Sequence, residues 1–408
     1  MKKILALVLA LCMILGMVAC GDTTTTSSTG DVSTDATLDI KVGFICLHDE
    51  TSTYDLNFIK GVEEVKKTLN LSDDQVIVKT NIAESQACYD AAADLVDQGC
   101  DVIFANSFGH ETFIIEAAKE FPNVQFCHAT GVKAHTENLA NYHNAFASVY
   151  EGRYLAGVAA GLKLNAMIAD GTITADKAVV GYVGAFPYAE VISGYTSFFL
   201  GVRSVCESAT MKVDFTGSWY DPDAEKNMAN ALMDLGCVLI SQHADSMGAP
   251  SACEARNVPN VSYNGSTEET CPNTFIVSSR INWAPYYEYM INCVVKGEAI
   301  AADWTGTIAT GSVVLTELGA KCPVEGTAAK IEEIKTKLQN GEVKVFDVSK
   351  FTVNGAALTE EHLADVDDDG TFTAETKVVA DGYFHESEYR SAPYFDVNID
   401  GIERLDNK

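Results

Sequence analysis

Basic residues are scarce in this sequence, which has 28 lysines and arginines against 57 aspartates and glutamates. With a formal net charge of −29, the protein has little with which to neutralise a phosphate backbone, so nucleic-acid binding is not expected. The same scarcity argues against a basic patch for an anionic membrane surface. The negative charge mainly keeps the protein soluble.

The common catalytic and metal-binding motifs are also missing. The sequence has no GxSxG turn, no HExxH helix and no phosphate-binding P-loop. No two cysteines form a CxxC pair, so neither a zinc ribbon nor a thioredoxin-like site is expected. We therefore expect no catalytic residues, no metal and no cofactor. A nucleoside-processing enzyme remains the alternative from a different class, because a fold alone does not exclude catalysis.

The cysteines that lie in apolar, strand-like runs, such as Cys46 and Cys127, are expected to be small buried hydrophobic residues. Exported proteins often pair their cysteines, and Cys253 with Cys271 is the pair that we would test first.

The first apolar run, residues 4–18, is too short for a membrane span and ends shortly before Cys20. Together with two preceding lysines, it predicts an export signal over residues 1–19, and it looks like a bacterial lipobox in which Cys20 carries the lipid. Residues 20–38 are rich in threonine and serine, so we expect a flexible tether. The expected location is the extracytoplasmic face of the cell membrane, held by a lipid anchor. Ordinary secretion with an incidental cysteine is the alternative.

Short apolar strands alternate with helices from residue 40 onward. The first block has expected strands at 40–45, 76–79, 101–105 and 124–127, and expected helices at 57–69, 85–98 and 111–120. A second block has strands at 178–183, 212–216, 237–241 and 260–263, and helices at 150–164, 191–207 and 223–235. This alternation indicates an α/β protein with two similar lobes, each a parallel sheet flanked by helices.

The two blocks set the expected domain organisation. Lobe 1 should span residues 39–148, and lobe 2 residues 149–279. Segment 280–320 should return to lobe 1, and about 321–350 to lobe 2. Repeated crossings of this kind make a hinge between two lobes that close on a ligand. Residues 351–408 should form an irregular, acidic C-terminal extension.

One segment of that extension, Asp365–Gly370, has the DxDxDG spacing of a calcium loop. The twelfth position of such a loop requires a bidentate acid, but it is Thr376 here, with Glu375 one residue early. We therefore expect an acidic surface turn rather than a calcium site.

The candidate ligand site follows from the fold, because open parallel sheets bind ligands beyond the carboxyl ends of their strands. Those loops carry the aromatic residues Tyr54, Phe108, Phe186, Trp219 and Trp283, and the polar residues Asp49, Asp55, His128, His243, Asp245 and Asn264. Aromatic faces with a few directional polar groups suit a sugar or a nucleobase rather than an inorganic anion.

Several short segments, taken in their order along the chain, resemble one known family. They are Ser107–Gly109, Tyr154–Gly157, Val180–Val191, Ser218–Pro222 and Gln242–Ser246. Through them the chain resembles the basic membrane protein family of solute-binding lipoproteins, which are the purine-nucleoside-binding components of ABC transporters. The resemblance implies a periplasmic-binding-protein-like fold of type I. It also implies a purine nucleoside or free purine base as ligand, and permease and ATPase subunits as partners.

The resemblance also implies roles for individual residues. Tyr54 and Trp219 would stack on the two faces of the purine, one from each lobe. Asp55, in place of the usual asparagine, would read the edge of the base, and Asp49 would meet a ribose.

Two departures from the family put ribose recognition in doubt. Nucleoside-binding members have an aspartate near Asn264 and a lysine within 278–283, whereas this chain resembles the branch with a tryptophan there, Trp283. A free base such as adenine therefore becomes credible. A sugar-binding protein of the same architecture stays open, as does a surface receptor that serves no transporter.

Overall fold

The computed structural model describes residues 38–367 and 373–406. The predicted export signal and Cys20 lie outside these residues, as does the predicted tether apart from Leu38. Within the described ranges, no helix combines the length and the apolar character that crossing a membrane requires.

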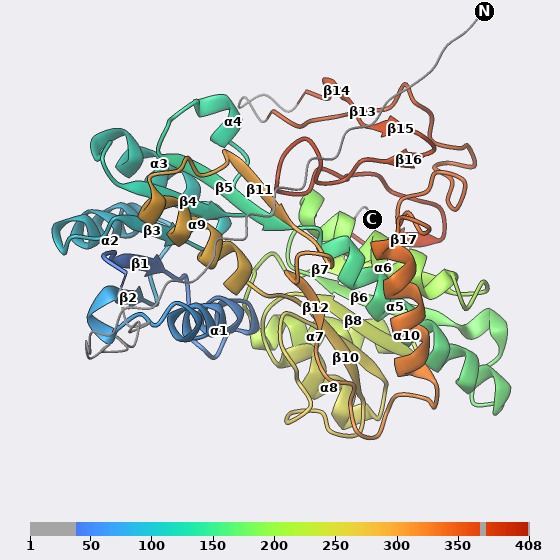
Figure 1. Cartoon of the computed structure of the whole chain (residues 1–408). Coiled ribbons are helices and arrows are strands. Elements are labelled where there is room, and N and C mark those ends of the chain that lie inside the picture. The colour runs from blue at the N-terminus through green and yellow to red at the C-terminus, as the bar shows by residue number, and fades with distance from the viewer. Residues whose placement is uncertain (1–37, 368–372, 407–408) are drawn as a thin grey trace, which may run out of the picture. The chain divides into compact units, whose positions relative to one another are not determined.

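The first sheet has six parallel strands in the order β11-β5-β4-β3-β1-β2 (Figure 1). They are β1 (Val42–Ile45), β2 (Val76–Lys79), β3 (Val102–Ala105), β4 (Gln125–Ala129), β5 (Tyr142–Ala147) and β11 (Asp303–Gly306). With this sheet, which we call lobe 1, go α1 (Thr53–Thr68), α2 (Gln86–Asp97), α3 (Glu111–Glu120), α4 (Ala134–Glu137) and α9 (Ala284–Lys296). Val102 and Phe104 face the core shared with α1 and α9, whereas Ile103 and Ala105 face α2 and α3.

The second sheet has seven strands in the order β12-β10-β9-β8-β6-β7-β17, all parallel to their neighbours except β12. They are β6 (Val179–Gly184), β7 (Thr210–Phe215), β8 (Leu239–His243), β9 (Asn260–Tyr263), β10 (Phe275–Ile281), β12 (Val313–Leu315) and β17 (Ile402–Arg404). With this sheet, lobe 2, go α5 (Val149–Ala169), α6 (Ala189–Arg203), α7 (Pro222–Asp234), α8 (Gly248–Arg256) and α10 (Thr327–Gln339).

The two sheets repeat one strand order, because β2-β1-β3-β4-β5 corresponds to β7-β6-β8-β9-β10. Each lobe is thus a largely parallel sheet flanked by helices, which confirms the predicted α/β fold. The chain enters lobe 2 with α5, returns to lobe 1 with α9 and β11, and re-enters lobe 2 with β12. This last return begins with Val313, earlier than the expected residue 321. The sequence did not indicate it, because a three-residue antiparallel strand leaves little periodic signal.

A close helix pair stabilises lobe 2. A Cβ atom at Gly157 of α5 would lie 2.0 Å from the carbonyl oxygen of Phe198, and one at Gly201 of α6 would lie 2.1 Å from that of Tyr154. Only glycine allows the two backbones to approach so closely. Packing of α5 against α6 therefore accounts for the glycine in the Tyr154–Gly157 segment, which is one of the segments that carry the family resemblance.

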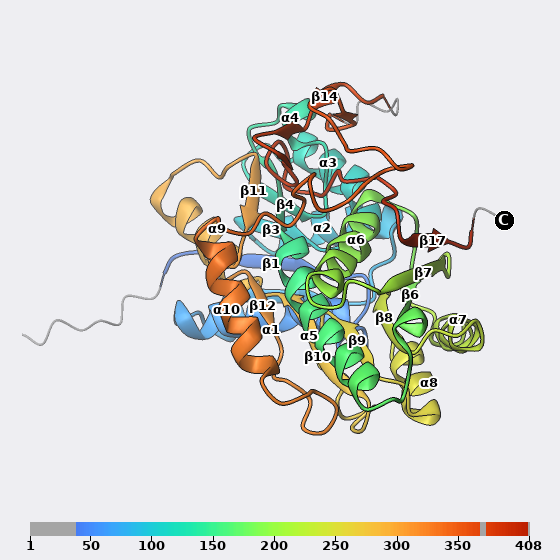
Figure 2. The same cartoon turned by 90° about the vertical axis from the view of Figure 1, so that its right-hand side faces the viewer.

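The C-terminal extension is more ordered than the sequence indicated. It holds two short antiparallel pairs, β13 (Leu363–Ala364) with β14 (Thr376–Lys377) and β15 (Val379–Ala380) with β16 (Tyr383–Phe384). It then ends in β17, which completes the second sheet by pairing with β7 (Figure 2). The prediction of an irregular segment is therefore wrong for β17, whose three residues carry no alternating apolar pattern.

All ten cysteines between residues 46 and 322 are buried free thiols. The pairing of Cys253 with Cys271 that we would have tested first is not present. The Cys271 thiol instead donates to the Thr267 carbonyl oxygen at 3.1 Å.

Candidate ligand-binding site

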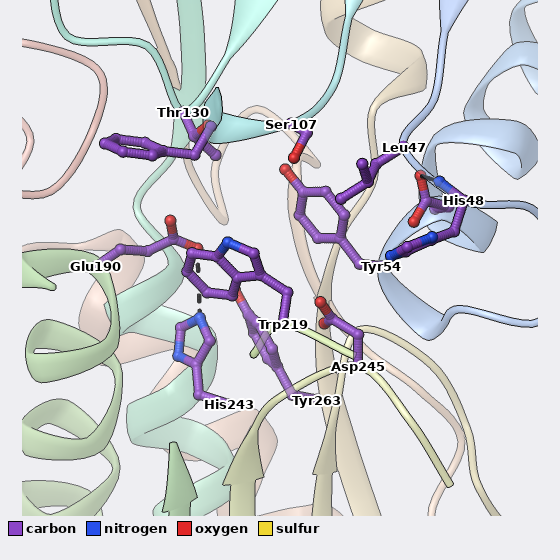
Figure 3. Close-up of a pocket in the computed structure, with 12 residues that line it drawn as sticks. Leu47, His48, Tyr54, Ser107, Thr130, Glu190, Trp219, His243, Asp245 and Tyr263 are labelled. Carbon is purple, nitrogen blue, oxygen red and sulfur yellow. Dashed lines mark hydrogen bonds and ion pairs between the residues drawn. The ribbon is translucent and has the colours of Figure 1, made fainter. Parts of the chain in front are cut away.

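A cavity lies where the carboxyl ends of strands from both sheets face each other (Figure 3). It has a volume of about 390 Å³, which includes the part open to solvent. Its lining residues from lobe 1 are Leu47, His48, Tyr54, Asp55, Ser107, Phe108 and Thr130, and those from lobe 2 are Glu190, Trp219, His243, Asp245 and Tyr263. None of these twelve residues is a lysine or an arginine.

The first turn of α1 supplies two of the lining residues. Ser52 caps this helix, since its hydroxyl accepts from the Asp55 amide at 3.2 Å, so the helix begins earlier than the expected residue 57. The Tyr54 hydroxyl donates to the Asn106 carbonyl oxygen at 2.6 Å, which fixes its ring at the cavity wall. This arrangement places an aromatic ring and a carboxylate side by side.

Asp55 is buried and only half satisfied. Its Oδ1 accepts from the His48 amide at 3.1 Å and from Asn106 Nδ2 at 2.7 Å, whereas its Oδ2 has no hydrogen-bond partner. A buried carboxylate oxygen without a partner is costly, so it favours a ligand that brings a donor.

The aromatic wall of lobe 2 is built from a stack behind Trp219. The Phe186 ring meets the Trp219 ring edge-on at 5.2 Å and itself stacks on Tyr188 at 5.0 Å. Phe186 does not line the cavity and instead supports Trp219. Figure 3 shows Tyr54 and Trp219 reaching into the cavity from opposite lobes.

His243 and Glu190 form a polar pair across the cavity floor. His243 Nε2 lies 3.3 Å from Glu190 Oε1, and the imidazole packs on the Tyr263 ring at 4.2 Å. Burial lowers the pKa of His243, which keeps the imidazole neutral. A neutral ring has one donor and one acceptor, and its Nε2 is used in the contact with Glu190.

Asp245 joins the two lobes. Its carbonyl oxygen accepts from the Thr53 amide at 3.1 Å, and its side chain accepts from Asn264 Nδ2 at 3.3 Å. Asn264 in turn accepts from Asn57 of lobe 1 at 3.2 Å. Desolvation, reinforced by the nearby Glu225 carboxylate, raises the pKa of Asp245 well above its usual value, which favours the neutral acid.

The structure brings six of the predicted site residues together in the cavity wall: Tyr54, Asp55, Phe108, Trp219, His243 and Asp245. Asn264 lies directly behind Asp245. His128 is buried beneath the site, where its Nε2 contacts the Ser107 carbonyl oxygen at 2.7 Å, and burial lowers its pKa to about 4.

Two further predicted residues lie away from the cavity wall. Asp49 sits on a surface turn, where it accepts from Thr51 and Asn81. Trp283 is buried in the core of lobe 1, stacked on Phe58 at 4.5 Å. The aromatic character of Trp283 therefore serves packing at this position.

Sequence reasoning did not single out six lining residues, which are Leu47, His48, Ser107, Thr130, Glu190 and Tyr263. Four of them, His48, Ser107, Thr130 and Glu190, lie in loops that the position rule identified, but they were not named as candidate ligand contacts. The role of Tyr263 in the cavity wall was not predicted, because it is the last residue of β9 and was assigned to the strand itself.

The family model of the ABC transporter substrate-binding proteins described as PnrA-like matches residues 46–348, a range that includes every lining residue. The chain belongs to this family. PnrA-like proteins are substrate-binding components of ABC transporters and work on the extracytoplasmic side of the membrane. Their family and fold are those of transporter components rather than enzymes.

Two curated relatives of this PnrA-like chain differ in what their names say they bind. It is 30% identical to a purine-binding protein of Brucella abortus over 69% of this chain and 78% of that protein. It is 31% identical to a putative ABC transporter glucose-binding protein of Haloferax volcanii over 62% of this chain and 60% of that protein.

The fold comparison agrees with the family. An ABC transporter solute-binding protein of Conexibacter woesei superposes with a TM-score of 0.61 at 19% identity, covering 75% of this chain and 98% of that one.

Proposed function

We propose that this PnrA-like protein captures a purine, as a free base or a nucleoside, and delivers it to the permease and ATPase of an ABC transporter. The observation that carries the proposal is the pair of rings, Tyr54 and Trp219, that enters one cavity from opposite lobes beside the unpartnered Asp55 oxygen. Two flat rings suit a flat heteroaromatic ligand, and the carboxylate suits its donor edge.

The charge of the site supports a neutral ligand. With no lysine or arginine in its wall and with Asp55 and Glu190 present, the cavity disfavours phosphate groups. A nucleotide is therefore a poor candidate.

A sugar is the second candidate, because aromatic platforms and carboxylates serve sugars equally and one relative is named for glucose. Mass spectrometry of the ligand that co-purifies with the protein separates the two. A purine, recovered unchanged, is the expected result. A hexose would overturn the purine assignment, and a cleaved nucleoside would favour an enzyme.

Substitution of Asp55 by asparagine should change which purine is preferred. The variant keeps an acceptor towards His48 but presents an amide donor to the cavity, so preference should shift by about tenfold towards purines that carry a carbonyl in place of an amino group. Calorimetry with adenine and hypoxanthine measures the ratio. Asp49→Asn, on the surface turn, is the matched control and should leave the ratio unchanged. An unchanged ratio in Asp55→Asn as well would remove Asp55 from base recognition.

We also propose that the export signal is cleaved before Cys20 and that Cys20 carries the lipid anchor, on the basis of the apolar run and the tether sequence. Cys20→Ala should abolish incorporation of labelled palmitate, because the acceptor thiol is lost. Ser27→Ala, within the same tether, should label normally. Undiminished labelling of Cys20→Ala would contradict the anchor.

A further inference from the structure

A fully buried arginine, Arg153 of α5, lies behind the part of the cavity floor that Tyr263 forms, and it does not itself line the cavity. Three aromatic rings surround its guanidinium. The carbon atom Cζ lies 5.0 Å from the centre of the Phe198 ring, 5.3 Å from that of Tyr263 and 5.4 Å from that of Tyr182. Aromatic faces attract a cation, but they compensate only part of the cost of burying one, so hydrogen bonds have to supply the rest.

The guanidinium donates five hydrogen bonds, all of them to neutral oxygen atoms. Nη1 donates to the Ser262 carbonyl oxygen at 3.1 Å and to the Ser279 hydroxyl at 3.4 Å. Nη2 donates to the Tyr182 hydroxyl at 3.0 Å, the Ser241 hydroxyl at 2.8 Å and the Gln242 carbonyl oxygen at 3.4 Å. These acceptors belong to β9, β10, β6 and β8, which are neighbours in the second sheet. One side chain thus joins four strands close to their carboxyl ends.

Two of the acceptors come directly before residues of the cavity floor. Gln242 precedes His243, and Ser262 precedes Tyr263. His243 and Tyr263 both line the cavity, and their rings pack on each other at 4.2 Å. Figure 3 shows both side chains reaching from the strand ends of lobe 2 towards the cavity. Arg153 therefore holds the backbone immediately before each of these two floor residues.

The charge of Arg153 also acts on the His243 imidazole. Burial lowers the pKa of His243, Glu190 of α6 raises it through a hydrogen bond and its charge, and Arg153 lowers it further. Tyr263 of β9 packs on the same imidazole, and burial raises the pKa of this phenol well above its usual value, so it stays neutral. Arg153 is thus the cation that opposes Glu190 at His243.

We infer that Arg153 is a positioning residue of the ligand site, which holds His243 and Tyr263 where they meet the ligand although it touches no ligand itself. The planar guanidinium suits this task because it presents donors at fixed angles to several strand ends at once, whereas a lysine ammonium is a single point of attachment. The inference rests on the proposed function for the place of the site, but not for the identity of the ligand.

Arg153→Lys tests the inference, because it keeps the positive charge and loses the planar fork of donors. Calorimetry of the full-length protein with adenine should show binding about tenfold weaker than in the wild type. A role confined to stability would lower the urea midpoint and leave the affinity of the folded protein unchanged. Tyr182→Phe removes one acceptor and keeps the ring, so it should remain folded and weaken adenine binding by a smaller factor.

The His243 imidazole gives a second readout that needs no ligand. Its ring packs on Tyr263, so the NMR shift of its Cε1–H proton reports how the two rings are placed. The signal should move in Arg153→Lys and, by less, in Tyr182→Phe. Arg153→Gln also removes the charge that opposes Glu190, so titration of the same signal should give a higher pKa for His243 than in the wild type.

The matched control is Arg203→Lys on α6. Arg203 also lies over an aromatic ring, that of Phe199 at 5.6 Å, but it is exposed and does not line the cavity. It should change neither the adenine affinity nor the His243 signal.

Unchanged affinity and an unmoved His243 signal in Tyr182→Phe, or in a folded Arg153→Lys, would overturn the inference and leave the proposed function standing. If neither adenine nor adenosine binds the wild type, the proposed function fails, and the His243 signal then decides the inference on its own.

Discussion

Alanine in place of Trp219 or Tyr54 is expected to weaken purine binding by about tenfold to a hundredfold in each case. A base stacked on an aromatic ring gains about 1 to 3 kcal/mol, and about 1.4 kcal/mol corresponds to a factor of ten in affinity. Trp219 is supported from behind by Phe186, so its ring is held in place for stacking before the ligand arrives. Calorimetry with the preferred purine measures the loss.

Conservative variants separate stacking from other effects. Trp219→Phe keeps a smaller ring and should lose less affinity than Trp219→Ala. Tyr54→Phe loses only the hydrogen bond to Asn106, so it should bind nearly as well as the wild type. Tyr389→Ala removes an exposed aromatic ring that does not line the cavity, so it serves as the control. If both alanine variants of the stacking pair were folded and bound purines normally, the site would lie elsewhere, and the sugar assignment would move ahead.

The second large expected effect is a change in the free energy of unfolding with pH, to which the buried Glu225 contributes. This carboxylate on α7 accepts from the Asp221 amide at 3.3 Å and from the Ser246 amide at 3.2 Å. Desolvation by burial raises its pKa from 4.5 to about 7, against the opposing effect of the Ser246 hydrogen bonds. Burial likewise raises the pKa of Glu151 and of Glu386 to about 7.

The direction of the pH effect follows from proton binding. Between about pH 4.5 and pH 7 the folded protein holds protons that the unfolded chain releases, so the free energy of unfolding falls as pH rises through this window. Each such glutamate contributes on the order of 2 to 3 kcal/mol to the fall. Buried histidines such as His128, whose pKa burial lowers to about 4, act in the opposite direction over much of the same window. The contribution of Glu225 is therefore measured as the difference in urea midpoint between the wild type and a Glu225 variant, at pH 5 and at pH 8.

Glu225→Gln imitates the protonated acid, so it should raise the urea midpoint at pH 8 and leave the midpoint at pH 5 nearly unchanged. The control is Glu333→Gln on α10. Hydrogen bonds from Lys337 and Lys330 lower the pKa of this exposed acid to about 2, so its substitution should give no gain at pH 8. A difference between Glu225→Gln and the wild type that is the same at pH 5 and at pH 8 would contradict the assignment of a buried proton to Glu225.

The sequence predicted the repeated part of the fold well, because β1, β3 and β6 are buried, mostly apolar runs separated by clear helices. It missed β5, whose interior carries His143 and Asn144. Both are buried, but both look like loop residues in a sequence. The Asn144 side chain accepts from the Ala134 amide at 2.7 Å, so a tertiary contact satisfies it. Local pattern carries no information about such contacts.

Only part of the candidate site could be predicted, because the direction in which a side chain points depends on tertiary contacts as well. The rule that ligands bind beyond strand ends identified the loops. Trp219, in the loop that follows the carboxyl end of β7, was a good candidate for this reason. The same rule could not distinguish Trp283, whose ring points into the core of lobe 1 rather than the cavity. Nor could it place the C-terminal extension against both lobes, because no local pattern specifies that position.

The pairing of β17 with β7 constrains the order in which the protein folds. Lys212 and Glu403, which form an ion pair across these two strands, are 191 residues apart in the chain. Until the last residues are available, β7 has unpaired amide and carbonyl groups along one side, and an open strand of this kind pairs readily with another chain. Closing so long a loop is also slow. Lobe 2 is therefore the part of the molecule whose folding finishes last and whose intermediates are the most exposed to aggregation.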